Sequence, residues 1–160
     1  MEWLSIVGAV GAPLLIIIGG ILSWILKDKS ERLRLQEEKT KKEQETIYNE
    51  LLKPYFIIFA DSGNSGRMSE AENIILSYKY KENAFKMRFF GSDNIIDTHN
   101  ELMQLSYKAE KSGKQDSVKM MKLIGKLFLA VRKDLGYPKT KLKEKDMISF
   151  IIKDIDDYMK

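Results

Sequence analysis

The chain carries no charged side chain between Glu2 and Lys27, so residues 3–26 form one uninterrupted uncharged run. As a single helix this run is about 36 Å long at ~1.5 Å per residue, which exceeds the roughly 30 Å hydrocarbon core of a bilayer. Trp3 and Trp24 stand near its two ends, about 31 Å apart in such a helix, and tryptophan is enriched at both membrane interfaces. The sequence therefore predicts a transmembrane anchor over residues 1–26.

A cleaved signal peptide is the alternative explanation of an N-terminal apolar run. No basic side chain precedes this run, which is longer than the roughly 7–15 apolar residues of a signal peptide, and its end lacks a small-residue cleavage site. The positive-inside rule puts the basic flank in the cytoplasm, so we expect an inner (plasma) membrane protein with its N-terminus outside and its C-terminal domain cytoplasmic. The residues expected at the membrane interface are Trp3, Trp24, Lys27, Lys29, Arg32 and Arg34.

Small residues recur on one face of the predicted span when they are placed at helical spacing. Such residues let two membrane helices approach closely, although glycine and alanine are also common in membrane helices that do not associate. We treat this face as a candidate surface for homo-oligomerisation. Its members are Ser5, Gly8, Ala12, Gly19 and Ser23.

Residues 27–46 are rich in charged helix formers and contain neither Gly nor Pro. Opposite charges recur four residues apart, as in Glu37 and Lys41, and each such pair adds a few tenths of a kcal/mol. Leu33 and Leu35 are the only large apolar residues, so a coiled coil would lack most of its a and d positions. We expect a charged juxtamembrane helix that continues the span as a solvated stalk.

Beyond residue 46, apolar residues recur near the helical period of 3.6 in every segment. This pattern predicts an all-α fold in which residues 47–160 form a cytosolic bundle of four to five helices, and the absence of cysteine suits a reducing compartment. The expected inward-facing residues are Ile47, Leu51, Tyr55, Ile58 and Phe59; Ala71, Ile74, Ile75, Tyr78, Phe85 and Phe89; Ile95, Ile96, His99, Leu102, Met103 and Ser106; Val118, Met121, Ile124, Phe128 and Val131; and Met147, Ile148, Ile151, Ile152, Ile155 and Tyr158.

Local signals set the expected helix boundaries. Pro54 marks a kink or a new helix start, and a capping box that begins at Ser69 opens the second helix. Ser92 or Asp93 can cap the third helix, and Gly136 is the expected C′ glycine of the fourth. The Ile-rich last segment has the most regular helical pattern.

The sequence shows no arrangement of side chains that is typical of catalysis. His99 is the only histidine, and Asp97 and Glu101, two residues to either side, point to the opposite face of a helix. A packed histidine is therefore the preferred interpretation over a metal ligand or a general base. Gly113-Lys114 lacks the other glycines and the Ser or Thr of a phosphate-binding loop. We expect no catalytic residue, cofactor or metal, and no enzymatic activity.

Basic charge is concentrated over residues 108–145, where twelve Lys and Arg face four acids, a net charge of +8. Such an excess attracts anionic lipid or nucleic acid. No aromatic side chain is clearly placed among these lysines for base stacking, and a membrane tether makes lipid headgroups the nearer polyanion. We therefore expect membrane lipids, and not nucleic acid, as a partner, unless the segment is simply a solvated lysine-rich surface.

The stretch Arg132-Lys133-Asp134-Leu135-Gly136, followed by Thr140-Lys141-Leu142, has a spacing that can be written R-x-D-L-G…T-x-L. It resembles the C-terminal part of a broad group of uncharacterised bacterial single-pass membrane proteins, strongly over about 30 residues. The resemblance implies a helical cytoplasmic domain and no assigned activity. That group often has Ser or Thr after the last leucine as a helix cap, whereas Lys143 stands here. Arg132, Asp134, Gly136 and Thr140 are thus either a structural turn or a recognition turn.

These observations predict a membrane-anchored, non-catalytic module that recruits or senses a partner protein at the cytoplasmic face of the membrane. The alternative is an oligomerising, membrane-disrupting effector, for example in defence against phage, because associated spans could permeabilise the bilayer.

Overall fold

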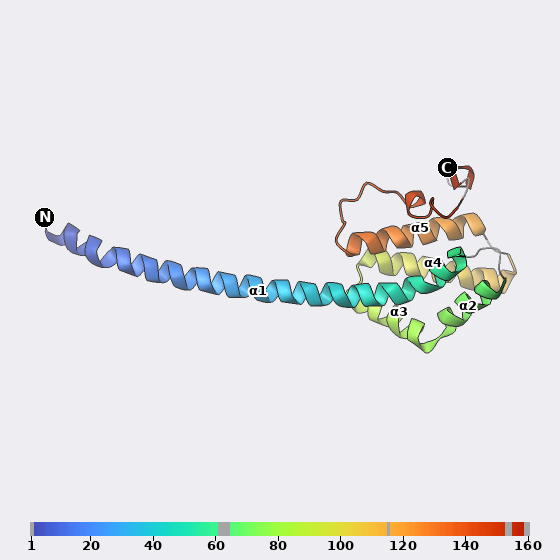
Figure 1. Ribbon diagram of the computed structural model, residues 1–160, viewed down its shortest axis with the longest axis horizontal. Coiled ribbons are helices and arrows are strands. Elements are labelled where there is room, and N and C mark those ends of the chain that lie inside the picture. Colours follow the sequence, from blue (N-terminus) through green and yellow to red (C-terminus); the bar gives the residue numbers. More distant parts are fainter. Residues whose placement is uncertain (1, 61–64, 115, 153–154, 159–160) are drawn as a thin grey trace. The chain divides into compact units, whose positions relative to one another are not determined.

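The computed structural model describes residues 2–60, 65–114, 116–152 and 155–158, with the backbone alone at residues 2–21 and 65. Every element in these ranges is helical (Figure 1), which confirms the all-α prediction. The elements are α1 (Glu2–Ala60), α2 (Ser65–Leu76), α3 (Tyr78–Phe90), α4 (Asp93–Ser112), α5 (Ser117–Asp134), a 3-10 turn (Lys145–Met147) and α6 (Ile155–Tyr158).

The chain divides into two compact units, Met1–Thr40 and Lys41–Lys160. In the first unit, the side chains of residues 29–40 are exposed along a helix, as the sequence predicted for the stalk. Two ion pairs at helical spacing lie on its surface, Asp28 with Arg32 at 2.9 Å and Arg34 with Glu38 at 3.4 Å. Such exposed pairs add little stability individually.

No helix in the part of the chain with described side chains holds a segment apolar and long enough to cross a bilayer. Residues 2–21, which make up most of the predicted span, lie outside that part. Their backbone belongs to α1.

The second unit is built around one hydrophobic core. Its buried residues come from the C-terminal part of α1, from α3, α4 and α5, and from the segment after α5. They include Ile47, Tyr48, Leu51, Tyr55, Tyr80, Met87, Ile95, Leu102, Ile124, Leu127, Phe128, Val131, Ile148 and Ile155. Burial of these side chains is the main stabilising term of the unit.

The α5 helix is the central element, since residues 127–131 are buried on all sides. It packs along α4, which lies beside it in Figure 1. Its C-terminus closes as predicted: Gly136 has a positive φ of 114°. The Tyr137 N–H donates to the Arg132 carbonyl, and the Gly136 N–H donates to the Lys133 carbonyl, both at 3.3 Å. This pair of hydrogen bonds is a Schellman motif.

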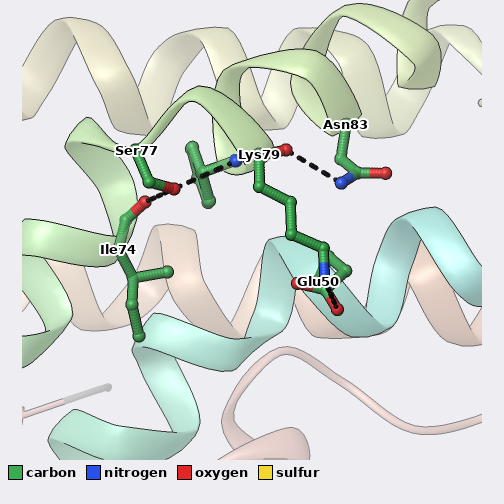
Figure 2. A network of polar contacts seen from close by, with 6 residues as sticks. Glu50, Ile74, Ser77, Lys79 and Asn83 are labelled. Carbon is green, nitrogen blue, oxygen red and sulfur yellow. Dashed lines mark hydrogen bonds and ion pairs between the residues drawn. The ribbon is translucent and has the colours of Figure 1, made fainter.

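The prediction of one continuous second helix is wrong. The helix is interrupted at Ser77, which separates α2 from α3, and these two helices meet at an angle in Figure 1. Ser77 has extended backbone, donates its hydroxyl to the Ile74 carbonyl and accepts the Tyr80 N–H (Figure 2). Ser77 is therefore the N-cap of a new helix. Ser69, the predicted cap, lies inside α2.

The break changes which residues of α3 face the core. Tyr80 and Met87 are buried, whereas Tyr78, Phe85 and Phe89, which were predicted to face inward, are exposed. A restart at Tyr78 turns the helix so that a different set of side chains faces the bundle.

Two further boundary predictions need correction. Helix α1 continues through Pro54, which is fully buried, so no new helix starts there. The Ile-rich last segment is not one regular helix: a 3-10 turn at Lys145–Met147 and hydrogen-bonded turns around Ile148 precede the short α6. Ile148 and Ile155 are still buried, whereas Tyr158, which was predicted to face inward, is 53% exposed. The apolar pattern thus predicted the burial of these two isoleucines correctly and the helical conformation of the segment incorrectly.

Gly125 of α5 allows the backbone of the C-terminal segment to approach closely. A Cβ atom at this position would collide with the Glu144 carbonyl oxygen. Because the obstacle is backbone, a shift of one flexible side chain cannot relieve the clash. Glycine inside a helix costs about 1 kcal/mol relative to alanine, and here the close approach requires it.

We predict that Gly125→Ala lowers the free energy of unfolding by about 1–3 kcal/mol, the usual range for overpacking. Urea denaturation followed by near-UV circular dichroism of the buried tyrosines measures this, and Lys122→Ala, an exposed change on the same helix, is the matched control. Equal stability of Gly125→Ala and wild type would contradict the close approach.

Candidate interaction surface

The predicted membrane-interface residues that the structure describes all lie exposed along α1. Trp24 is 70% exposed, and Lys27 and Lys29 are exposed with it. Arg32 and Arg34 are exposed but form the two ion pairs of the stalk. Trp3 lies outside the described side chains.

The predicted association face falls almost entirely outside the described side chains. Ser23 is exposed. The other four members lie among residues 2–21, of which only the backbone is described, so this face stays a prediction. They are Ser5, Gly8, Ala12 and Gly19.

Asp134, one of the candidate recognition residues, is a structural junction. Its Oδ2 atom accepts a hydrogen bond from the Tyr48 hydroxyl of α1 at 2.7 Å and another from the Ser92 backbone N–H at 3.0 Å. Ser92 is the N-cap of α4. Burial raises the pKa of Tyr48 well above its ordinary value, and the Asp134 carboxylate raises it further. One carboxylate thus connects α1, α4 and α5.

Arg132 and Thr140 are likewise engaged within the turn that follows α5. The Arg132 guanidinium lies over the Tyr137 ring, 4.4 Å from its centroid, and Arg132 Nε donates to the Thr140 hydroxyl at 3.3 Å. Gly136 supplies the positive φ between them. These contacts match the structural interpretation of the turn.

His99 is buried, as predicted, at only 5% exposure. Its Nε2 atom lies 3.2 Å from the Tyr80 hydroxyl, and a further side-chain hydrogen bond joins Tyr80 to Tyr55. Its Nδ1 atom has no hydrogen-bond partner among the described residues. Burial, together with the nearby positive charge of Arg88, lowers the pKa of His99 to about 4.

This environment favours a neutral packed imidazole over a metal ligand. No group of three or more His, Cys, Asp or Glu side chains within the described ranges could hold a metal ion. The expectation of no metal site remains a prediction for the whole chain.

The basic segment predicted to contact lipid is distributed over two regions of the second unit. Lys108 and Lys111 lie at the end of α4, Lys114 lies in the link that follows, and Lys119 and Lys122 lie in the first two turns of α5. The remaining cations lie in the middle or at the C-terminal end of α5 or in the segment beyond it. They are Lys126, Arg132, Lys133, Lys139, Lys141, Lys143 and Lys145.

The most unusual surface of the second unit is on α3. Tyr78 is 81% exposed, Phe85 62% and Phe89 70%, and the Phe85 and Phe89 rings pack edge to face with centroids 5.2 Å apart. At 3.6 residues per turn these three side chains fall within about 40° of one another around the helix axis. We call this face the aromatic stripe (Tyr78, Phe85 and Phe89).

The orientation of α3 is fixed by contacts with α1 near its two ends. Lys79 forms an ion pair with Glu50 of α1 at 2.7 Å, and the Asn83 amide donates to the Lys79 carbonyl at 2.9 Å (Figure 2). Gln44 of α1 donates to the Phe90 carbonyl at the other end of the helix. The stripe is thus held outward by contacts at both ends of α3.

Sequence reasoning missed this surface and also the roles of Tyr48 and Tyr80. The available signal was Ser77: with this residue as an N-cap, residues 80 and 87 share one face of the following helix, and residues 78, 85 and 89 share the opposite one.

Comparisons of the chain with protein-family models, with curated proteins and with solved structures found no match.

We predict that the Tyr48–Asp134 hydrogen bond contributes about 1.5–3 kcal/mol, as is usual for bonds to charged groups. Tyr48→Phe, Asp134→Asn and the double variant form a thermodynamic cycle that is measured by urea denaturation. Asp97→Asn, an exposed change on α4, is the control. Additive effects of the two single changes would mean that the contact carries no coupling energy.

Burial of neutral His99 makes the stability of the second unit depend on pH. The unfolded histidine takes up a proton near its ordinary pKa of about 6.5, whereas the folded one does so only near pH 4. Protons therefore favour the unfolded state as the pH falls through this window, with a loss of up to about 3 kcal/mol.

We predict that His99→Gln removes this part of the pH dependence, because glutamine does not titrate. Free energies of unfolding at pH 7 and pH 4 are compared for both proteins, so that the contribution of the carboxylates cancels. Parallel pH profiles for the variant and wild type would contradict the burial of an uncharged imidazole.

Proposed function

We propose that this chain is a membrane-anchored, non-catalytic interaction module whose working surface is the aromatic stripe of α3. The observation that carries the proposal is the exposure of Tyr78, Phe85 and Phe89 together on one helix face. Contiguous exposed apolar surface marks interaction sites on soluble domains.

The membrane location is supported by the sequence of the N-terminal segment. The uncharged run over residues 3–26 and the cations that follow it predict a single-pass anchor with a cytoplasmic C-terminal domain. The module would then present its stripe to partners at the cytoplasmic face of the membrane. The small-residue face of the span remains a candidate for homo-oligomerisation.

The side chains that were candidates for metal binding, catalysis or recognition form structural contacts in the second unit. Asp134 connects three elements, Arg132 orders the turn after α5, and His99 is packed beside Tyr80. The stripe differs from them, because its aromatic rings contribute little to the core while they remain exposed to solvent. This contrast supports binding through α3.

In-cell photocrosslinking tests the proposal. With Phe85 replaced by benzoylphenylalanine, we expect the full chain in the carbonate-washed membrane fraction and a light-dependent adduct, identified by mass spectrometry. The same amino acid in place of Gln104, an exposed residue of α4, is the matched control and should give little adduct.

The two halves of the proposal fail separately in this experiment. Recovery of the chain in the soluble fraction would refute the anchor. Equal adduct yields at positions 85 and 104 would refute the stripe as a working surface.

A further inference from the structure

Cations border the aromatic stripe on both sides. Placed at 3.6 residues per turn, Lys81 and Arg88 lie on one flank of the stripe, and Lys79 and Lys86 lie on the other. Glu82, half-buried, is the only acid of α3. Glu82 lies about 40° from Tyr78 around the helix axis, between the stripe and Lys86. The stripe therefore has cations on both sides, and one of these sides also carries an acid.

The charge of one edge is not neutralised within the described residues. On one flank, Lys79 pairs with Glu50 at 2.7 Å and Lys86 with Glu82 at 2.8 Å. On the other flank, Arg88 donates only to the neutral Asn100 amide oxygen at 3.2 Å, and Lys81 has no ion-pair partner among the described residues. The surface thus keeps a net positive charge beside its apolar rings.

We infer that the stripe docks on the surface of a bilayer that contains anionic lipid, with Phe85 and Phe89 in the interfacial layer and the flanking cations at the headgroups. This inference rests on the proposed function and names the partner of its working surface. Aromatic side chains with basic residues beside them are typical of helices that lie in the membrane interface. Anionic headgroups complement the edge formed by Lys81 and Arg88.

A second copy of the chain fits the stripe less well. Pairing two stripes would bring the edges formed by Lys81 and Arg88 in the two copies close together, and charges of the same sign at an interface are unfavourable. A protruding helix face also needs a complementary pocket on a protein partner, whereas a lipid surface adapts to it. With the tether in place, anionic lipid is also the nearest polyanion.

Site-directed spin labelling of the full chain tests this inference. The chain contains no cysteine, so Phe85→Cys, Phe89→Cys and the control Gln104→Cys each give one labelled position. The labelled proteins are placed in nanodiscs of phosphatidylcholine alone or with roughly one third phosphatidylglycerol. Power saturation then compares accessibility to oxygen, which partitions into lipid, with accessibility to a water-soluble nickel complex.

In anionic nanodiscs we expect oxygen accessibility to exceed nickel accessibility several-fold at positions 85 and 89, and the reverse at position 104. In pure phosphatidylcholine the preference at 85 and 89 should weaken. With the label at 85, Lys81→Glu together with Arg88→Glu should abolish the preference. Lys41→Glu with Lys53→Glu, the same charge change at exposed sites of α1, should leave it intact.

Three outcomes would overturn the inference. Water-like accessibility at 85 and 89 in anionic nanodiscs would show that the stripe does not reach lipid. Spectral broadening by spin–spin coupling would place a second copy on it. An equal effect of the α3 and α1 charge reversals would reduce the contact to general electrostatic attraction.

Failure of the proposed function gives a different result. In that case the labelled chain would not co-purify with nanodiscs of either composition. A chain that co-purifies but has a water-exposed position 85 refutes the lipid contact alone. All three labelled sites are exposed, so the labels should not disturb the core. A near-UV circular dichroism spectrum equal to that of the wild type verifies that the bundle is intact.

Discussion

The Asp134 carboxylate accepts hydrogen bonds from the Tyr48 hydroxyl and from the Ser92 backbone N–H, and these two bonds connect three elements of the second unit. Tyr48 belongs to α1, Ser92 begins α4 and Asp134 ends α5. A carboxylate beside the N-terminus of α4 is also favoured by the helix dipole. The hydrophobic core supplies most of the stabilising free energy, but it is non-directional. The geometry at Asp134 is directional, and it favours one arrangement of the C-terminus of α5, the N-terminus of α4 and the part of α1 around Tyr48.

The sequence predicted features that depend on local conformation or on apolar periodicity. The all-α class, the burial of His99 and the C′ role of Gly136 were of this kind, because each depends on residues a few positions apart. The partners of Asp134 lie 42 and 86 residues away along the chain. No spacing rule reveals such a contact, so the same residue could be considered for recognition and for structure until its neighbours were known.

The failed predictions have a common physical origin. Ala71, Ile74, Ile75, Tyr78, Phe85 and Phe89 keep one helical period across Ser77, so periodicity alone favours a single helix with a single inward face. One local contact and one tertiary contact override that pattern: Ser77 caps a new helix, and Lys79 forms an ion pair with Glu50 of α1. Likewise, the Ile-rich C-terminal segment has a helical pattern, but its backbone approaches Gly125 and forms turns. In both places the apolar residues do recur at the helical period, but the continuous helix predicted from that period does not form.

The break at Ser77 also affects how this region can tolerate insertions and deletions. Within a continuous helix, one inserted residue rotates everything that follows by about 100°. Extended backbone at Ser77 does not transmit such a rotation, and the facing of α3 is set by its own buried residues, Tyr80 and Met87, and by its contacts to α1. Insertions or deletions can therefore change the length of α2 without changing which residues of α3 face outward.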